Sequence, residues 1–380
     1  MRTMIVLGAM AVAAMTAHSQ WTLQNSNSTA SLRGIHSLGG GVAWASGTNG
    51  TVLRTEDGGY LWQACTIPPG AEKLDFRGIQ AFNANAAIVM SSGKGDLSRL
   101  YKTTDGCHSW KLLFTNPDKD GFWDAIQFNR AQWGWILGDP VKGRFVLFAT
   151  HDKGHTWIKQ QNKGLNADPN TQGAFAASNS SLAAIGGYMK FASGGTGGAF
   201  VYSMVETTIC LDACSDADMD YEGRKDKWSV QSIPVGNKSQ GAGVFSLVRR
   251  HEQNAPNESQ DTVIAVGGDY TQADKSDNTA AWSSDDGGHW AVSTSPPHGY
   301  RSAVAYDAAT KTWITVGPNG TDMSTDDGKN WRAVKPNPTL NEPADADKNW
   351  NALSLPFVVG PHGRIGRLNE AALKSALSAK

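Results

Sequence analysis

The sequence has 380 residues, with 34 Lys and Arg against 35 Asp and Glu, and it carries 14 Trp. Glycine is abundant at 42 residues, whereas charged residues make up only 18 %, against roughly 25 % in an average globular protein. This composition excludes a coiled coil, a disordered tail protein and a collagen. The near-zero net charge also gives no strong field for nucleic acid or an anionic membrane.

Residues 1–19 have the pattern of a secretory signal peptide. Arg2 supplies the positive start, residues 4–15 supply an apolar stretch, and Ala17-His18-Ser19 is a small-x-small cleavage site. The apolar stretch is too short to span a bilayer as a helix, and no later segment is long enough. We therefore expect a secreted or periplasmic protein, most simply a monomer, with no membrane span.

A sequence box recurs along the chain with a period near 45 residues. Five segments read Ser/Thr-x-Asp-x-Gly-x-x-Trp or nearly so, namely Thr55–Trp62, Thr103–Trp110, Thr150–Trp157, Ser283–Trp290 and Ser324–Trp331. Their Trp positions differ by 48, 47, 133 and 41 residues, so the long gap is expected to hide weaker units. Such a period is typical of propellers and other repeat architectures.

An apolar strand opens each unit of this repeat. Seven openings start at residues 32, 76, 122, 173, 242, 300 and 350, the fourth of them reading GAFAAS. A second strand ending in Gly follows in most units, as in VAWASG and TWITVGPNG. The last unit lacks a box, while Trp21-Thr-Leu-Gln stands alone near the N-terminus, so this segment is expected to complete the last unit.

The pattern predicts an all-β fold, a seven-bladed β-propeller of four-stranded blades over residues 20–368, closed into a ring by the N-terminal strand. Blades of this size cannot bury both faces alone and stack around an axis. Residues 203–228 are expected to form an insertion in blade four, either a lid or a surface decoration. Residues 369–380 are expected to form a peripheral helical tail.

Four cysteines in an oxidising compartment favour disulfide pairing. The close pair Cys210 and Cys214 is the preferred disulfide, and Cys65 with Cys107 is either a second pair or two free thiols. A zinc site is not expected, because there is no second close pair and no nearby His completes the set. We expect no metal and no cofactor.

The repeated box resembles the Asp-box, or BNR repeat, of sialidases and many unrelated propellers. Its Asp and Ser/Thr side chains are suited to bonding the turn backbone, and its Trp to packing between blades. The alternative is a catalytic or metal-binding role for the Asp. We interpret the following box residues as structural: Asp57, Trp62, Asp105, Trp110, Asp152, Trp157, Asp285, Trp290, Asp326 and Trp331.

A wider resemblance covers residues 21–367. The segments LRGIHSLGGGVAWASGTNGTVLRTEDGGYLW, FWDAIQF with WILGDPVKGRF, VIAVGGDY and GYRSAVAY resemble secreted bacterial propellers related to the photosystem II stability/assembly factor family. The resemblance implies a non-catalytic propeller that binds a partner polypeptide. Blade four departs from the pattern, because the insertion replaces its box.

The starts of the first strands and the ends of the second strands should converge on one face around the axis, which we call the top face. These positions carry Arg, Asp and aromatic side chains suited to a binding surface. The alternative is that the Arg and Asp side chains pair with one another and lock the ring. The candidate binding residues are Arg33, Arg77, Trp123, Asp124, Asp139, Asp269, Tyr270, Tyr300 and Arg301.

Signatures of catalysis are weak in this sequence. The Phe/Tyr-Arg-Ile-Pro signature of sialidases is absent, and GGTGG at 194–198 lacks the strand–turn–helix context of a dinucleotide site. A two-carboxylate glycoside hydrolase is the alternative function, using Asp124 with Asp139 or Asp269. A redox enzyme would need a bound cofactor. The sequence thus favours a binding or assembly protein that recognises a protein or a glycan through its top face.

Overall fold

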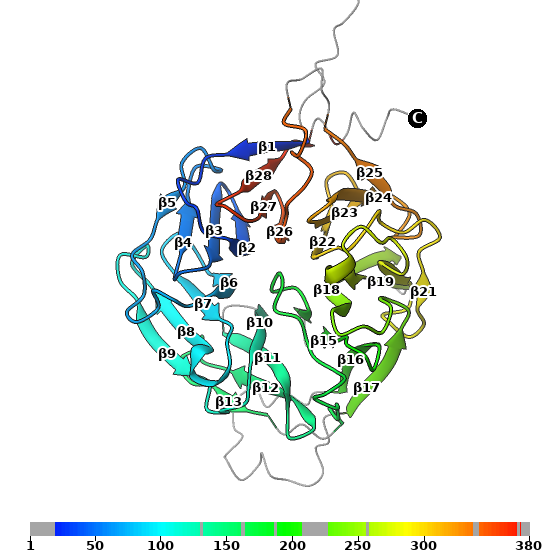
Figure 1. The fold of residues 1–380 in the computed structure, drawn as a ribbon, viewed down its shortest axis with the longest axis horizontal. Helices are drawn as coiled ribbons and strands as arrows, with labels where there is room; N and C mark the ends of the chain where they lie inside the picture. The colour runs from blue at the N-terminus through cyan, green and yellow to red at the C-terminus, as the bar shows by residue number, and fades with distance from the viewer. Residues whose placement is uncertain are drawn as a thin grey trace, which may run out of the picture.

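The computed structural model describes residues 20–129, 132–160, 164–185, 188–206, 227–255, 258–336, 342–370 and 373. These residues form seven antiparallel four-stranded sheets arranged as blades around an axis (Figure 1). The predicted fold is therefore confirmed. Among the described residues, no helix is long and apolar enough to cross a membrane.

The first three blades follow one another in sequence, each running from an innermost strand outward. Blade one contains β2 (Leu32–Gly39), β3 (Val42–Gly47), β4 (Val52–Thr55) and β5 (Gln63–Ala64). Blade two contains β6 (Phe76–Ala81), β7 (Ala87–Ser91), the short 3-10 helix η1 (Gly95–Leu97), β8 (Arg99–Thr103) and β9 (Lys111–Thr115). Blade three contains β10 (Trp123–Asn129), β11 (Trp133–Val141), β12 (Arg144–Thr150) and β13 (Ile158–Lys159).

The next three blades repeat this order. Blade four contains β14 (Leu182–Ile185), β15 (Tyr188–Ala192), β16 (Ala199–Glu206) and β17 (Lys227–Ile233). Blade five contains β18 (Ala242–Ala255), β19 (Glu258–Asp269), the 3-10 helix η2 (Tyr270–Gln272), β20 (Ala280–Ser283) and β21 (Ala291–Val292). Blade six contains β22 (Ala303–Asp307), β23 (Thr312–Gly317), β24 (Gly320–Ser324) and β25 (Arg332–Val334).

Blade seven joins the two ends of the chain. It contains β26 (Ala352–Ser354), β27 (Phe357–Val359) and β28 (Ile365–Leu368), with β1 (Trp21–Gln24) as its outermost strand. Trp21 lies opposite Leu368 and Gln24 opposite Ile365 in an antiparallel register, and Figure 1 shows the blue β1 beside the red β28. The N-terminal strand thus closes the ring as predicted.

The hydrophobic core is divided among the interfaces between blades. Seven clusters of buried apolar side chains are present in the described residues, and each joins two neighbouring blades. Trp62 illustrates the arrangement, because its ring meets Phe357 of blade seven edge to face at 5.5 Å. Burial on both faces of every blade is what holds the ring together.

Blade four differs from the sequence prediction at its start. GAFAAS was predicted to be its first strand, but β14 begins only at Leu182. Gly173 forms isolated bridges instead of a strand, pairing with Gly194, which in turn pairs with Gly243. The reason lies in the following residues, because Ser178 and Asn179 bond to groups of other blades rather than to a strand of their own sheet.

The predicted insertion and tail lie mostly outside the described residues. Residues 203–206 and 227–228 of the predicted insertion belong to the paired strands β16 and β17, and residues 207–226 are outside the described part of the chain. Of the predicted tail, Leu373 is buried in the same cluster as Trp21.

Within the described residues, the disulfide is the second of the two pairs considered from the sequence. Cys65 and Cys107 are bonded, with their Cα atoms 5.3 Å apart, whereas Cys210 and Cys214 lie outside the described residues. The stacking of blade two on blade one explains this pairing, because the Nε1 of the box residue Trp110 donates to the carbonyl oxygen of Thr66, just after β5, at 2.9 Å. Thr66, next to Cys65, donates to the carbonyl oxygen of Cys107 at 2.8 Å, so the two sulfurs are brought together despite a separation of 42 residues.

Candidate functional site

The boxes are turn-stabilising elements in every described copy. In the first box the Thr55 hydroxyl donates to the Asp57 carboxylate at 2.8 Å, and this carboxylate accepts the backbone N–H of Leu61 at 3.0 Å. The same pair of contacts recurs with Asp105, Asp152, Asp285 and Asp326. Hydrogen bonds from the Ser109 hydroxyl, the Ser109 N–H and the Thr103 hydroxyl lower the pKa of Asp105 to about 2. The box carboxylates therefore accept hydrogen bonds from groups of their own turns and stabilise these turns.

The top face carries a β-bulge at one repeated position of the inner strands. The register of the first strand shifts at Arg33, at Arg77, at Asp124 and at Phe245. A bulge leaves one residue unpaired and redirects its side chain. The glycine that follows is needed for close packing in blade two, where a Cβ on Gly78 would lie 2.8 Å from Ile126. Different side chains are thus presented toward the axis from equivalent positions.

Arg301 of blade six serves the scaffold. It lies one position earlier in the repeat than Arg33, because Ala303 opposes Val316 as Gly34 opposes Ser46, so it takes the place of the buried Leu32. The Arg301 side chain is completely buried, and its Nε donates to the Asp322 carboxylate at 2.8 Å. His298 bonds the other oxygen of that carboxylate at 2.8 Å. Burial lowers the pKa of Arg301 while Asp322 opposes this shift. This residue matches the alternative interpretation of a locking ion pair, although the partner lies in the same blade.

Arg77 is paired but remains accessible. Its Nε donates to Asp75 at 2.8 Å, and its side chain is 28 % exposed. A second guanidinium nitrogen donates to the carbonyl oxygen of Ala176 at 3.1 Å, which belongs to the segment before β14. The pairing again stays within one blade. Asp75 was not singled out from the sequence, although its place directly before FRGI in the repeat is a signal that could have found it.

Arg33 is the unpaired member of the three. Its half-buried guanidinium has no hydrogen bond or ion pair within the described part of the chain, and its Nε is enclosed without a partner. Burial and the nearby positive charge of Arg77 lower the pKa of Arg33, whereas Asp75 and Tyr300 act in the opposite direction. A guanidinium prefers a carboxylate in a forked arrangement. This side chain is therefore the group most in need of an external anion.

Two carboxyl groups lie beside the arginines. Asp124 is buried, and one of its oxygens has no partner among the described residues. Burial and the charge of Asp139 raise the pKa of Asp124 well above its usual range, while Arg77 opposes this effect. Burial raises the pKa of Asp139 to about 6, although the backbone N–H of Ala174 donates to its carboxylate at 2.9 Å. Burial thus favours the neutral form of Asp124.

Aromatic side chains border this group. Phe175 and Phe245 stack with ring centroids 3.9 Å apart, and Tyr300 meets Phe245 edge to face at 4.7 Å. Tyr300 is buried, and burial raises its pKa, whereas Tyr270 is 55 % exposed. Phe245 was missed in the sequence, although its place in AGVFSLV matches that of Arg33 in LRGIHSL. We call Phe175, Phe245, Tyr270 and Tyr300 the aromatic wall.

The remaining two candidates are structural. Asp269 is buried and accepts five hydrogen bonds, two from Thr271 and one each from Ser239, Asn237 and Gln272. Burial acts to raise the pKa of Asp269, but these bonds hold it below the usual range. Trp123 is buried and stacks on Phe114 at 5.4 Å. Neither side chain is available to a ligand.

A connecting segment brings the surviving candidates together. In the segment before β14, the Ser178 hydroxyl donates to the carbonyl oxygen of Ser302 in blade six at 2.7 Å. The amide oxygen of Asn179 accepts the backbone N–H of Ile126 in blade three at 2.7 Å. The segment therefore crosses the middle of the ring. It lies beside what we call the axial cluster, namely Arg33, Asp75, Arg77, Asp124 and Asp139.

Within the described residues, no group of three or more His, Cys, Asp or Glu is arranged to hold a metal ion. The donor set of the axial cluster consists of two guanidiniums and three carboxyl groups. Its chemistry is that of carboxylate recognition or of acid–base transfer.

Comparisons with known proteins identify the architecture. No family model and no curated protein matches the sequence. Among solved structures, YCF48 from Cyanidioschyzon merolae matches with a TM-score of 0.56 at 16 % identity, covering 92 % of this chain and 99 % of that one. YCF48 bound to a D1 peptide matches with a TM-score of 0.52 at 15 % identity, covering 92 % and 97 %. An extracellular domain from B. thetaiotaomicron has a TM-score of 0.54 at 10 % identity, covering 92 % and 40 %. This chain is thus a seven-bladed propeller structurally similar to YCF48 at low sequence identity.

Proposed function

We propose that the protein is a binding or assembly propeller that holds a segment of a partner polypeptide over the axial cluster. The observation that carries the proposal is the half-buried, unpaired guanidinium of Arg33. An unsatisfied buried charge costs free energy in the unbound protein. A carboxylate from a partner, on an acidic side chain or at a chain end, would remove that cost.

The aromatic wall supplies the second half of the recognition. Tyr270 is exposed beside Phe245, and exposed tyrosines are typical anchors of protein interfaces. The raised pKa of Asp124 favours its neutral form, which would limit the repulsion that an incoming carboxylate meets. The likeness to a propeller solved with a bound peptide supports a polypeptide ligand. The Cys65–Cys107 disulfide supports work in an oxidising compartment.

The proposal is tested by crosslinking followed by a matched binding measurement. The photo-crosslinker p-benzoylphenylalanine replaces Tyr270, and the adducts formed in the native cell envelope are identified by mass spectrometry. A synthetic peptide from the adduct is then titrated calorimetrically into wild type, Arg33→Ala and Arg332→Ala. Arg332 is an exposed arginine on the outer strand β25 and serves as the control.

We expect Arg33→Ala to weaken binding at least about tenfold, because a desolvated charge-assisted pair contributes about 1.5–3 kcal/mol. Arg332→Ala should bind as wild type does. Equal binding by wild type and Arg33→Ala would contradict the proposed site. The absence of any polypeptide adduct would contradict the partner class.

A glycoside hydrolase is the second candidate, because Asp124 and Asp139 are neighbouring carboxyl groups whose pKa values are both raised. Such a pair suits acid–base catalysis. Against it, Asp124 is only 1 % exposed. Hydrolysis of a nitrophenyl glycoside panel that is lost in Asp139→Asn and retained in Arg33→Ala would favour the hydrolase over the binding function.

A further inference from the structure

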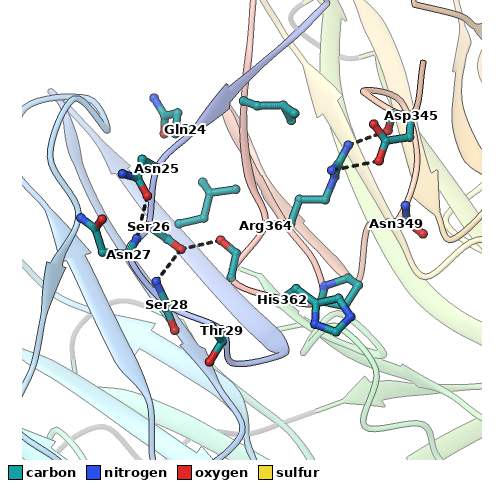
Figure 2. A pocket seen from close by; sticks show the side chains of 14 residues that line it. Gln24, Asn25, Ser26, Asn27, Ser28, Thr29, Asp345, Asn349, His362 and Arg364 are labelled. Carbon is teal, nitrogen blue, oxygen red and sulfur yellow. Dashed lines mark hydrogen bonds and ion pairs between the residues drawn. The ribbon is translucent and has the colours of Figure 1, made fainter. Parts of the chain in front are cut away.

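A groove lies at the seam where the two ends of the chain close the ring. It has a volume of about 670 Å³ and is open to solvent. Its walls are the connection from β1 to β2 on one side and residues 345–349 on the other, with the β27–β28 hairpin between them (Figure 2). We call it the seam groove. It is separate from the axial cluster, none of whose residues lines it.

The walls are fixed by contacts across the seam. The Ser26 hydroxyl donates to the carbonyl oxygen of Gly363 at 2.6 Å, and the N–H of Gly363 donates to Ala30 at 2.6 Å. On the other side, Arg364 pairs with Asp345 at 3.2 Å and lies over the ring of Trp350 at 4.8 Å. The groove is therefore preformed, which lowers the entropic cost of binding a ligand.

Several polar side chains of the groove are not used by the fold. Asn27, Thr29, Asn349 and His362 are exposed, and their side chains make no hydrogen bond within the described residues. Figure 2 shows these four distributed over both walls and the hairpin. Asn27, Asn349 and His362 also adopt left-handed backbone conformations, with φ of 52°, 62° and 55°. Residues other than glycine adopt that region at a cost, and such residues cluster at functional sites.

The chemistry of the lining favours an uncharged ligand rich in hydroxyl groups. Amide, hydroxyl and imidazole side chains both donate and accept hydrogen bonds, as vicinal sugar hydroxyls do. The charge of Arg364 is already balanced by Asp345, so the groove offers no unpaired cation to a phosphate. Leu23 and Pro361 add an apolar surface for the carbon face of a ring. The volume is within the roughly 300–1,000 Å³ of small-ligand sites.

We propose that the seam groove binds a neutral oligosaccharide of two or three units. Ligand held there contacts the connection after β1 and the hairpin of blade seven together. Occupancy therefore stabilises the closed ring as well as anchoring the protein to a glycan, in addition to the polypeptide partner proposed at the axis.

The test uses substitutions that keep the backbone conformation. Glycine adopts positive φ without a steric cost, so Asn27→Gly with Asn349→Gly removes two amides and leaves the turns intact. The matched control is Lys142→Gly with Lys311→Gly, two exposed residues that also have a φ of 53° and lie outside the groove. Maltotriose, cellotriose and chitotriose are the probes, with triglycine and inorganic phosphate as competitors of other chemistry.

Saturation-transfer NMR and calorimetry should detect binding of at least one trisaccharide to wild type and to the lysine control. The asparagine variant should bind at least about tenfold more weakly, and Arg33→Ala should bind like wild type because the axial cluster is not involved. The proposal is overturned if none of the three sugars binds, or if the asparagine variant binds as wild type does. Preferred binding of triglycine or phosphate at the groove would overturn the ligand class.

Discussion

Arg33 and Arg301 both lie near the start of an inner strand, one position apart in the repeat, and should respond in opposite ways to the same substitution. Methionine keeps much of the length of arginine and removes the charge. In Arg301→Met the carboxylate of Asp322 loses the guanidinium that bonds it at 2.8 Å while remaining only 1 % exposed. Breaking a buried ion pair on one side costs about 3–5 kcal/mol. In Arg33→Met no ion pair is lost, since Arg33 has none within the described residues.

The expected shifts follow from the size of the chain. An unfolding entropy of about 2.1 cal/mol/K per residue gives about 0.8 kcal/mol per kelvin for 380 residues. Arg301→Met should therefore lower Tm by about 4–6 °C. Arg33→Met should leave Tm unchanged or raise it by about 1 °C, because it removes a half-buried charge that has no partner.

Differential scanning calorimetry and urea titration of the two variants measure this contrast. His298 still bonds Asp322 in Arg301→Met. The further substitution Asp322→Asn removes the buried charge that has lost its arginine, so the double variant should recover part of the lost stability. A loss of similar size in both single variants would refute the distinction between a scaffold arginine and a functional one. So would a stable Arg301→Met.

Three further predictions concern the carboxyl pair, the disulfide and the blade interfaces. The pKa of Asp139 is raised to about 6, so the folded state binds a proton more tightly than the unfolded state. This group therefore stabilises the fold below about pH 4 and loses that contribution as the pH rises to 6. Urea titration should show Asp139→Asn to be more stable than wild type by about 2–3 kcal/mol at pH 7 and equally stable at pH 4. The double variant Cys65→Ser with Cys107→Ala should lose up to about 4 kcal/mol of stability, as expected for a loop of this length. Cys65→Ser with Cys107→Gly should recover about 1 kcal/mol, because position 107 has a φ of 64°, which glycine adopts more easily. Equal stability of the two double variants would contradict backbone strain at position 107. Trp62→Ala removes a ring that is 2 % exposed at the interface with blade seven and should lower the free energy of unfolding by about 3–5 kcal/mol. A loss below about 1 kcal/mol in urea denaturation, as for a surface residue, would contradict this role of the ring.

The sequence was sufficient for the architecture because the repeat carries local chemistry in every unit. Each box places a hydroxyl and a carboxylate two residues apart, and this spacing makes the same turn wherever it occurs. Trp21-Thr-Leu-Gln could be assigned to the last blade because that blade lacked a strand. The start of blade four could not be assigned in this way. GAFAAS has the apolar pattern of a strand, but its place is set by bonds that Ser178 and Asn179 make to distant blades.

The site could be predicted only as a set of positions. The repeat predicted near-equivalent positions for Arg33, Arg77 and Arg301. The bulges confirm the common register of Arg33 and Arg77, whereas Arg301 takes the place of Leu32. The three arginines differ in the carboxylate that each guanidinium does or does not bond. Asp322 stands 21 residues after Arg301 and Asp75 two residues before Arg77, and no periodicity in the sequence specifies such pairings. The same limit applied to Cys65 and Cys107, whose closeness depends on how one blade stacks on the next.

In this ring, residues that stabilise the fold and residues available for binding lie in different places. The seven apolar clusters lie between blades, and none of them contains a residue of the bulged positions. Exchange of a polar side chain there leaves these clusters intact, whereas Phe245 packs on Phe175 and Tyr300. Arg33, Arg77, Asp124 and Phe245 occupy that position in four blades and differ in charge and size. A rigid scaffold with variable inner positions can present a specific pattern of charge and aromatic surface to one partner, at little cost in folding free energy. Exchanging Arg33 for another side chain should therefore change what the protein binds while leaving the propeller intact.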